Sequence, residues 1–330
     1  MKTALVTGGG GFIGSYLTER LVHRGVSVRV FDNFWRGSEL NLKSVYDKID
    51  RVKGDIRNPD QVNTAMKGVD TVYHLASIQG TKFFYEYPDL VLETGLLGNL
   101  NVAKAAGHND VKRLIYASSS EVYGEPTIFP TPENHQLVVA DPSNPRWSYS
   151  TTKIAGEVIF KNFSRKMGFS STILRIHNAY GPRMGWQHVI PEFCRRIVLG
   201  EEFVIQGDGS ETRSFCFVSD IVDGMILAGE REEARNETFN LGSDVLEISV
   251  NELAKRLMTI AGVSLAPRYV PRLAGSTPRR KPDISRIRNV LGYEPRVSLD
   301  EGLETTFRWY KKEITFLSTR DENERYPWSQ

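Results

Sequence analysis

The sequence predicts an α/β fold in which a doubly wound parallel sheet carries helices on both faces. Two features indicate this fold. A glycine-rich turn, residues 7–14, directly follows the first apolar run, and short apolar runs then alternate with longer amphipathic segments through the first half of the chain. Parallel strands need such alternation, because the crossover between them is usually a helix. We therefore expect ligands to bind at the carboxyl ends of the strands.

The glycine-rich turn has the sequence TGGGGFIG and precedes an amphipathic run that contains Leu17, Leu21 and Val22. The order strand, turn, helix suits a phosphate, because residues without Cβ let backbone N–H groups approach it and the helix start offers unpaired donors. The glycine spacing departs by one residue from G-x-G-x-x-G, and such a turn can simply connect two elements. The pattern alone therefore indicates a phosphate site only weakly.

The second strand candidate, residues 26–32, alternates in polarity and ends on Asp32. A carboxylate at this place can accept hydrogen bonds from both ribose hydroxyls of an adenosine, and it would repel a 2′-phosphate. The alternative is that Asp32 caps a turn. With the glycine turn before it, Asp32 predicts a dinucleotide site that takes NAD rather than NADP.

Composition limits the number of domains and the classes of partner that the chain can have. The chain has 330 residues and a formal net charge of +2, which allows one large or two ordinary domains and argues against nucleic acid as a main partner. The two cysteines, Cys194 and Cys216, and the six histidines show no metal-ligand spacing. No apolar run reaches membrane length. Because the first strand begins within a few residues of Met1, we expect no signal peptide. We expect a cytoplasmic protein that binds no metal and no membrane.

Strands and helices continue to alternate up to about residue 176. The strand candidates are residues 49–55, 71–76, 111–117 and 171–176, and the helix candidates are residues 89–107 and 149–167. Asp55, Leu75, Ala76 and residues 118–121 fall at strand ends, so we expect them to line one crevice. We predict a dinucleotide-binding domain over residues 1–176 with a return strand near 237–241. A smaller α/β substrate-binding region would cover residues 177–330.

Tyr149 and Lys153 are four residues apart at the start of a helix candidate, so their side chains share one face. A phenol titrates near pH ~10 and is a poor base. The lysine ammonium and the positive nicotinamide of NAD would stabilise its phenolate. Tyr149 could then remove a hydroxyl proton while the cofactor takes the hydride, with Ser119 hydrogen-bonded to the same hydroxyl. A lone Tyr-x-x-x-Lys pair is usually a surface pair, but this one follows a dinucleotide turn and a serine-rich strand end.

Together these motifs resemble the extended short-chain dehydrogenase/reductase family of nucleotide-sugar epimerases, dehydratases and decarboxylases. The resemblance spans about residues 3–312 and is carried by residues 7–15, 32–33, 54–56, 74–76, 118–124, 149–153 and 178–183. It implies a Rossmann sheet, NAD as the cofactor, and a nucleoside-diphosphate sugar, foremost a UDP-sugar, as the substrate. It also implies a homodimer through a four-helix bundle. The helices at 89–107 and 149–167 agree with that bundle, because they carry apolar residues on more than one face.

The resemblance also implies roles for particular residues. The implied cofactor contacts are Gly8, Gly11, Phe12, Ile13, Gly14, Asp32, Asn33, Asp55, Ile56, Leu75, Ala76, Tyr149 and Lys153. The implied catalytic residues are Ser119, Ser120, Glu121, Tyr149 and Lys153. The implied substrate contacts are Ser119, Asn178, Arg183, His188, Val189, Arg213 and Arg280, although a histidine such as His188 is more often structural than a ligand contact. Two departures stand out: Gly95 replaces an asparagine that many relatives carry on the cofactor side, and Trp147 replaces a common proline and could reshape the sugar pocket.

The family members that the chain resembles begin by oxidising the C4 hydroxyl to a 4-keto sugar. An epimerase then returns hydride to the other face, whereas a decarboxylase or dehydratase benefits from a carboxylate near C5, where Glu121 stands. Ser120–Glu121, residues 212–216 and residues 280–284 resemble UDP-glucuronate decarboxylases, and Arg280 could hold a sugar carboxylate. Residues 184–191 resemble epimerase-like relatives. We expect a nucleotide-sugar 4-epimerase, with a UDP-glucuronate decarboxylase or a 4,6-dehydratase as the alternative and a non-catalytic NAD-binding sensor as a minor one.

Overall fold

A seven-stranded parallel sheet forms the centre of the computed structural model, which describes residues 1–272 and 275–318. The strands are β1 (Thr3–Thr7), β2 (Ser27–Asp32), β3 (Ile49–Lys53), β4 (Thr71–His74), β5 (Arg113–Ser119), β6 (Ser170–Ile176) and β11 (Thr238–Leu241). Their order is β11-β6-β5-β4-β1-β2-β3. The strand order reverses between β1 and β4, and ligands of such sheets bind at that point. The predicted doubly wound Rossmann-type sheet is confirmed.

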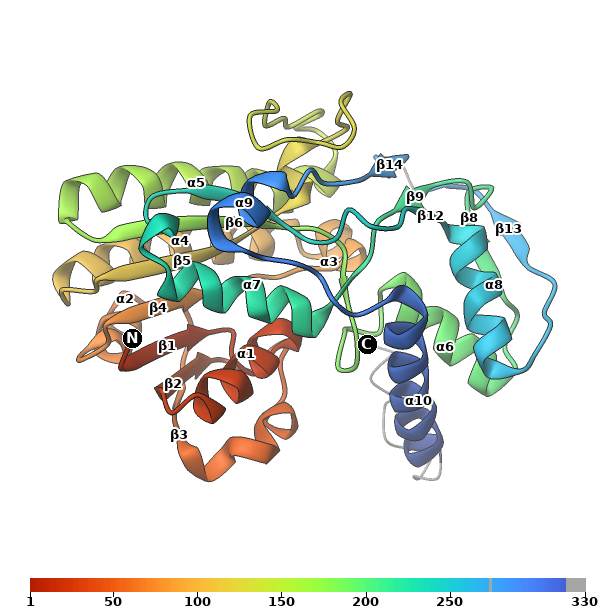
Figure 1. Ribbon diagram of the computed structural model, residues 1–330, viewed down its shortest axis with the longest axis horizontal. Helices are drawn as coiled ribbons and strands as arrows, with labels where there is room; N and C mark the ends of the chain where they lie inside the picture. The colour runs from red at the N-terminus through yellow and green to blue at the C-terminus, as the bar shows by residue number, and fades with distance from the viewer. Residues whose placement is uncertain (273–274, 319–330) are drawn as a thin grey trace.

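Helices cover both faces of this sheet (Figure 1). One face is covered by α1 (Phe12–His23), the 3-10 helix η1 (Glu39–Lys48), α7 (Val218–Glu230) and α9 (Ser285–Leu291), and the other by α2 (Pro59–Met66), α4 (Pro88–His108) and α5 (Ser148–Met167). Successive strand residues enter the two cores in turn: Val6 packs under α1, whereas Leu5 packs under α4. Burial on both faces explains why the central strands β1, β4 and β5 lack an exposed polar side, whereas the edge strand β3 is partly exposed.

A second region with its own core lies beyond the carboxyl end of the sheet (Figure 1). Its helices are α6 (Val189–Leu199), α8 (Val250–Ala261) and α10 (Leu299–Ser318), and its short strands are β7 (Ala179–Tyr180), β8 (Val204–Gln206), β9 (Thr212–Arg213), β10 (Cys216–Phe217), β12 (Ile248–Ser249), β13 (Arg268–Val270) and β14 (Arg279–Arg280). The chain leaves this region after β10, adds α7 and β11 to the first one, and then returns. Residues 319–330, the end of the expected substrate-binding region, lie outside the described part.

Short helices complete the rim of the sheet. They are α3 (Thr81–Glu86) and the 3-10 helices η2 (Ser120–Tyr123), η3 (Pro145–Trp147) and η4 (Glu232–Ala234). Helix α3 follows β4, η2 follows β5, and η3 directly precedes α5. These three helices therefore stand at the carboxyl edge of the sheet. This edge is where ligands are expected.

Helices α4 and α5 lie side by side on one face of the sheet (Figure 1). Gly95 is a contact point between them, because a Cβ at this position would lie 2.3 Å from Cβ of Thr152. The glycine that replaces the usual asparagine therefore permits close packing of the two helices. On the outside of the pair, Leu97 and Val158 keep 48% and 57% of their surface exposed. A homodimer through this surface stays a prediction.

Three further features hold for the residues that the structure describes. No helix among them is long and apolar enough to cross a membrane. Within the same residues, no group of three or more His, Cys, Asp and Glu side chains could hold a metal ion. Cys194 and Cys216 are both buried as free thiols.

Candidate active site

A cavity of about 1130 Å³ opens at the carboxyl ends of the strands, between the sheet and the second region. All the site residues that the sequence predicts lie on its wall. They are Gly8, Gly11, Phe12, Ile13, Gly14, Asp32, Asn33, Asp55, Ile56, Leu75, Ala76, Ser119, Ser120, Glu121, Tyr149, Lys153, Asn178, Arg183, His188, Val189, Arg213 and Arg280. The structure thus brings together residues from both halves of the chain, although their individual roles stay predictions.

The glycine turn forms one end of this cavity and fits a dinucleotide phosphate. A Cβ at Gly14 would lie 2.1 Å from the carbonyl oxygen of Gly8, and a Cβ at Gly8 would lie 2.8 Å from the amide nitrogen of Ala76. Gly11 is the N-cap of α1 and offers no side-chain cap, and the first turn of α1 contains no acidic residue. The first N–H groups of α1 are therefore free to donate to a phosphate at the positive end of the helix dipole.

Asp32 is held in a fixed orientation beside the glycine turn. Its Oδ2 accepts a hydrogen bond from the Gly10 amide at 2.9 Å, and its Oδ1 accepts one from the Phe34 amide at 2.8 Å. Burial raises the pKa of Asp32, while these backbone hydrogen bonds oppose the rise. The carboxylate is thereby presented at the end of β2, where the ribose hydroxyls of an adenosine are expected.

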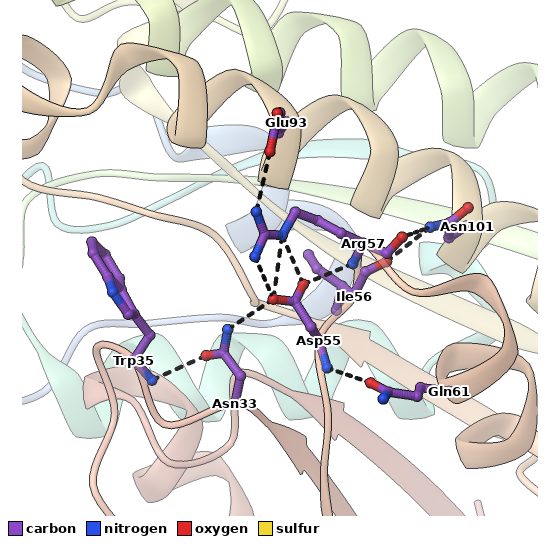
Figure 2. Close-up of polar contacts among 8 residues, drawn as sticks. All are labelled: Asn33, Trp35, Asp55, Ile56, Arg57, Gln61, Glu93 and Asn101. Carbon is purple, nitrogen blue, oxygen red and sulfur yellow. Dashed lines mark hydrogen bonds and ion pairs between the residues drawn. The ribbon is translucent and has the colours of Figure 1, made fainter.

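Asp55 lies at the centre of a polar network on the adenine side (Figure 2). The Arg57 guanidinium donates to it at 2.8 Å and also reaches Glu93 on α4 at 3.1 Å. Asn33 donates to the other side of the same carboxylate oxygen at 3.2 Å. The hydrogen bond from Arg57 is the main cause that lowers the pKa of Asp55. Neither Arg57 nor Glu93 was predicted from the sequence, although an arginine two residues after a ligand carboxylate is a signal for such a pair.

The predicted catalytic pair lies under the serine-rich end of β5. Nζ of Lys153 donates to the Ala117 carbonyl at 2.8 Å and lies 5.4 Å from the centre of the Tyr149 ring. Burial lowers the pKa of Lys153 to about 7, against the opposing charge of Glu157. Burial and the negative charge of Glu121 raise the pKa of Tyr149, while hydrogen bonds with Ser119 and Ser77 oppose the rise. In the cofactor-free protein Tyr149 therefore keeps its proton, and it needs an additional positive charge to become a base.

A buried cluster of three charges stands next to Tyr149. Oε1 of Glu121 accepts from Arg280 at 2.5 Å, and Oε2 accepts from Arg146 at 2.8 Å. The three side chains are at most 15% exposed. Burial alone would raise the pKa of Glu121, but the charges and hydrogen bonds of Arg280 and Arg146 outweigh it and hold this pKa well below its usual range. Both guanidiniums therefore favour the ionised form of Glu121 in the ligand-free protein.

Polar atoms without a partner surround this cluster. Nε of Arg280 and Nη1 of Arg146 are buried, and neither makes a hydrogen bond within the described part of the chain. Two guanidiniums against one carboxylate leave an excess positive charge. Arg213 adds another, because among the described residues its guanidinium donates to the backbone carbonyls of Thr212, Thr277 and Pro278 and to no carboxylate. Buried cations without counter-charges favour an anionic ligand here.

The other predicted substrate contacts differ in how far their side chains are already engaged by partners within the protein. Asn178 donates to the Ser214 carbonyl at 3.1 Å, and Val189 begins α6 with no side-chain cap before it. Arg183 reaches Glu19 at 3.0 Å and also donates to the Asn41 carbonyl, so its guanidinium joins the two regions although it touches the cavity wall. Burial and the charge of Arg36 lower the pKa of His188 to about 4, so this histidine is neutral.

Trp147 does not reshape the sugar pocket, because it is buried and is not part of the cavity wall. Its neighbour Arg146 lines the cavity instead, beside Phe84, whose ring stacks on Tyr149 with centroids 5.1 Å apart. Neither Arg146 nor Phe84 was predicted from the sequence. An arginine three residues before the predicted base is a usable signal for Arg146, but no local pattern distinguishes Phe84 from an ordinary core phenylalanine.

The fold and the site define an NAD-dependent enzyme that acts on nucleotide sugars. The model of the NAD-dependent epimerase/dehydratase family matches residues 4–242, and the chain belongs to this family. It is 34% identical over 320 residues to the UDP-N-acetyl-alpha-D-glucosaminuronate decarboxylase of Bacillus cytotoxicus, which covers 94% of this chain and 98% of the relative. It is 36% identical over 308 residues to UDP-glucuronic acid decarboxylase 3 of Arabidopsis thaliana, covering 91% of this chain and 86% of the relative.

Solved structures show the same architecture. The UDP-glucuronic acid 4-epimerase of Bacillus cereus, in complex with UDP-glucuronic acid and NAD, superimposes with a TM-score of 0.87 at 26% identity, covering 94% of this chain and 99% of that one. The expected cofactor NAD is confirmed. The expected 4-epimerase is not, because the curated relatives just described are decarboxylases and favour the alternative that uses Glu121.

Proposed function

We propose that this enzyme decarboxylates a UDP-linked hexuronate. The observation that carries the proposal is the buried cluster of Glu121, Arg146 and Arg280, which places excess positive charge and unpartnered N–H groups beside Tyr149. A guanidinium is suited to a carboxylate, since its parallel N–H groups match the two carboxylate oxygens. Both relatives named above act on uronates by name, which supports the same substrate class.

The geometry suits a reaction that starts at C4 of the sugar. Bound NAD supplies the hydride acceptor. Tyr149 takes the proton of the C4 hydroxyl, Ser119 orients that hydroxyl, and Lys153 stabilises the phenolate by its charge. The product of this step is a β-keto acid, because the carboxylate sits on C5, next to the new carbonyl. Loss of CO₂ then leaves the electron pair of the C5–C6 bond in an enolate across C4 and C5, and C5 takes a proton.

The cluster assists the loss of CO₂ in two ways. Arg280 and Arg146 orient the substrate carboxylate, through the Nε–H of Arg280 and the Nη1 of Arg146, which have no hydrogen-bond partner among the described residues. Glu121, held as an anion by Arg146, places a negative charge close to that carboxylate, and this repulsion ends when neutral CO₂ leaves. Reduction at C4 completes the cycle and gives a UDP-pentose. The phosphates of the UDP moiety would meet Arg213 and the start of α6.

A 4-epimerase of a UDP-hexuronate is the second candidate, and the similarity to the Bacillus cereus structure favours it. Such an enzyme also needs Arg280 for the carboxylate, but it must return hydride before CO₂ is lost. Glu121 disfavours this outcome, because a second carboxylate beside the substrate makes retention of the first one less favourable.

Incubation with UDP-glucuronate, UDP-N-acetylglucosaminuronate and UDP-glucose in deuterated water, followed by NMR, tests the proposal. We expect CO₂ and a UDP-pentose with deuterium at C5 from a uronate, and little turnover of UDP-glucose, which lacks the carboxylate. Tyr149→Phe is the control for background chemistry. A C4-inverted uronate without deuterium at C5 would establish the epimerase instead, and inversion of UDP-glucose would exclude both uronate readings.

A further inference from the structure

The loop between β2 and η1 lies directly on the glycine turn. The Ser38 amide donates to the Gly10 carbonyl at 2.9 Å, and Nδ2 of Asn41 donates to the same oxygen at 2.8 Å. A Cβ at Gly37 would lie 2.7 Å from the carbonyl carbon of Gly10. The residue before Gly37 therefore starts at the edge of the dinucleotide phosphate site.

That residue is Arg36, and its side chain extends across the cavity. Cζ lies 4.0 Å from the centre of the Phe83 ring. Nη2 lies 2.9 Å from the position that a Cβ of Gly185 would take, so the absence of a side chain at Gly185 makes room for the guanidinium. Arg36, Phe84, Gly80 and Gly185 all line the same cavity. The guanidinium thus stands between the glycine turn on one side and the loop before α6 on the other.

Arg36 has no counter-charge, a property that it shares with Arg213 among the described arginines of the cavity wall. Other arginines of the cavity wall reach carboxylates: Arg183 pairs with Glu19, Arg196 with Glu192, Arg272 with Glu211, and Arg146 and Arg280 with Glu121. Arg36 makes no ion pair or hydrogen bond in the part of the chain that the structure describes. Burial lowers its pKa to about 10, so it stays charged at neutral pH. A charge that is mostly removed from water and unpaired is costly, which indicates that a ligand supplies the missing anion.

From this geometry we propose that Arg36 binds the pyrophosphate of NAD, from the side of the groove opposite to the start of α1. The glycine turn and the free N–H groups of α1 place this pyrophosphate next to Gly37. The helix end contributes only about half an elementary charge, whereas the pyrophosphate carries two negative charges. Arg36 supplies a full positive charge and parallel N–H donors that match phosphate oxygens.

Aromatic contacts hold the loop in the position that this role needs. The Trp35 ring lies 5.4 Å from Phe83 and 6.4 Å from Tyr87, edge to face in both cases. These contacts join the loop after β2 to the segment after β4, and both line the cavity. Arg36 and Trp35 therefore connect two walls of the dinucleotide groove. An enzyme that must return hydride to the same sugar benefits from such a connection, because early loss of the cofactor would leave a keto intermediate behind.

Binding measurements on protein stripped of cofactor test the proposal. Isothermal titration calorimetry with NAD, ADP-ribose, AMP and UDP is carried out on the wild type, Arg36→Met and Arg36→Lys. We expect Arg36→Met to weaken NAD and ADP-ribose about 10- to 100-fold, the range of a charge-assisted hydrogen bond. AMP, which lacks the second phosphate, and UDP should change less than about twofold. Arg36→Lys should restore part of the loss, because it keeps the charge but not the planar fork.

Arg20→Met is the matched control, since Arg20 pairs with Asp223 at the other end of α1 and lies away from the cavity. It should bind NAD as the wild type does. Circular dichroism and thermal melting of each variant check the fold. NAD affinity should also fall more steeply with salt in the wild type than in Arg36→Met. Unchanged NAD affinity in Arg36→Met would overturn the proposal, and so would a loss confined to UDP or a UDP-uronate, which would assign Arg36 to the substrate instead.

Discussion

The two ends of the cavity recognise anions by different means. At the cofactor end, Gly8, Gly11 and Gly14 bring backbone N–H groups close to a phosphate, and the carboxylate of Asp32 is itself held by two backbone amides. At the sugar end, the buried Arg146 and Arg280 and the half-buried Arg213 present side-chain charges. Recognition by backbone N–H groups depends on the space that the glycines leave free and is insensitive to most side-chain changes, and the proposed Arg36 contact is the side-chain exception at this end. Side-chain charge depends on exact partners, so a few substitutions there can alter the reaction without altering the fold.

The comparison also explains how the two ends are coupled. Glu121 lies two residues beyond Ser119, the last residue of β5, and its charge adds to the effect of burial in raising the pKa of Tyr149. The sugar end therefore makes Tyr149 a weaker acid until the positive cofactor ring and Lys153 offset that charge. Chemistry at C4 is expected only when the cofactor end is filled.

The largest effect is expected at the junction of the two ends. Tyr149→Phe should lower turnover about 10²- to 10⁴-fold, because it removes the proton acceptor. NAD content should stay at the wild-type level, since the glycine turn and Asp32 are untouched. Steady-state rates and the nucleotide released on denaturation measure the two effects in one preparation. Near-normal turnover would remove Tyr149 from the mechanism.

A smaller effect is expected at the sugar end. Arg146→Met removes one of the two cations that keep Glu121 ionised, so the pKa of Glu121 should rise. Glu121 then has Arg280 as its remaining cationic partner, which leaves Arg280 less available to the substrate carboxylate. We expect kcat/KM for the uronate to fall about 10- to 100-fold at neutral pH, the cost of one charge-assisted contact. The fall should become larger as pH decreases, because Glu121 then binds a proton in the variant but not in the wild type.

A pH–rate profile of Arg146→Met checks this prediction. Arg165→Met, an exposed arginine further along α5, is the matched control and should keep the wild-type profile. NAD affinity should be equal in all three proteins, since Arg146 lies at the sugar end. If the rate of Arg146→Met is lowered by the same factor at every pH, with no additional fall at low pH, the assigned role of Arg146 is contradicted.

The preference for NAD over NADP tests the role of Asp32 at the cofactor end of the cavity. NAD should be the nucleotide that denaturation releases, and Asp32→Ala should raise affinity for NADP relative to NAD about tenfold or more, because it removes a like charge from the 2′-phosphate position. Competition binding with both nucleotides measures the ratio. Kinetics with the uronate at saturating cofactor should change little. Recovery of NADP alone from the wild type would refute the assignment of Asp32.

The smallest effect on the chemistry is expected outside the cavity. Leu97→Glu with Val158→Glu places two charges on the exposed face of α4 and α5 and should shift a dimer toward monomer in light scattering. The exposed Val245→Glu is the control and should leave the mass unchanged. A concentration-independent monomer for the unmodified chain would reject the dimer. Activity should change less than in the other variants, because neither position lines the cavity.

Local patterns in the sequence were enough to predict the cofactor end. The turn, the strand before it and the helix after it are contiguous, and Asp32 ends the next strand, so strand–helix alternation alone places them together. Tyr149 and Lys153 follow from the same logic, since one helix face holds both. Glu121 and Arg280 could be predicted only as separate candidates, because they are 159 positions apart and no periodicity links β5 to β14.

The sequence by itself determined the doubly wound sheet, the glycine turn and Asp32 at one edge of that sheet, and the shared helix face of Tyr149 and Lys153, since each depends on short-range periodicity and spacing. The tertiary structure alone decided which side chains meet at the sugar end and in what charge state. Arg146 comes from the turn before α5 and Arg280 from β14, and only their meeting on Glu121 turns three ordinary charged residues into a buried anion between two cations. Arg36 shows the same dependence, because the absence of a counter-charge around it is a property of the folded cavity. Electrostatics in a buried site depends on distance in space, and for these residues distance along the chain carries no information about it.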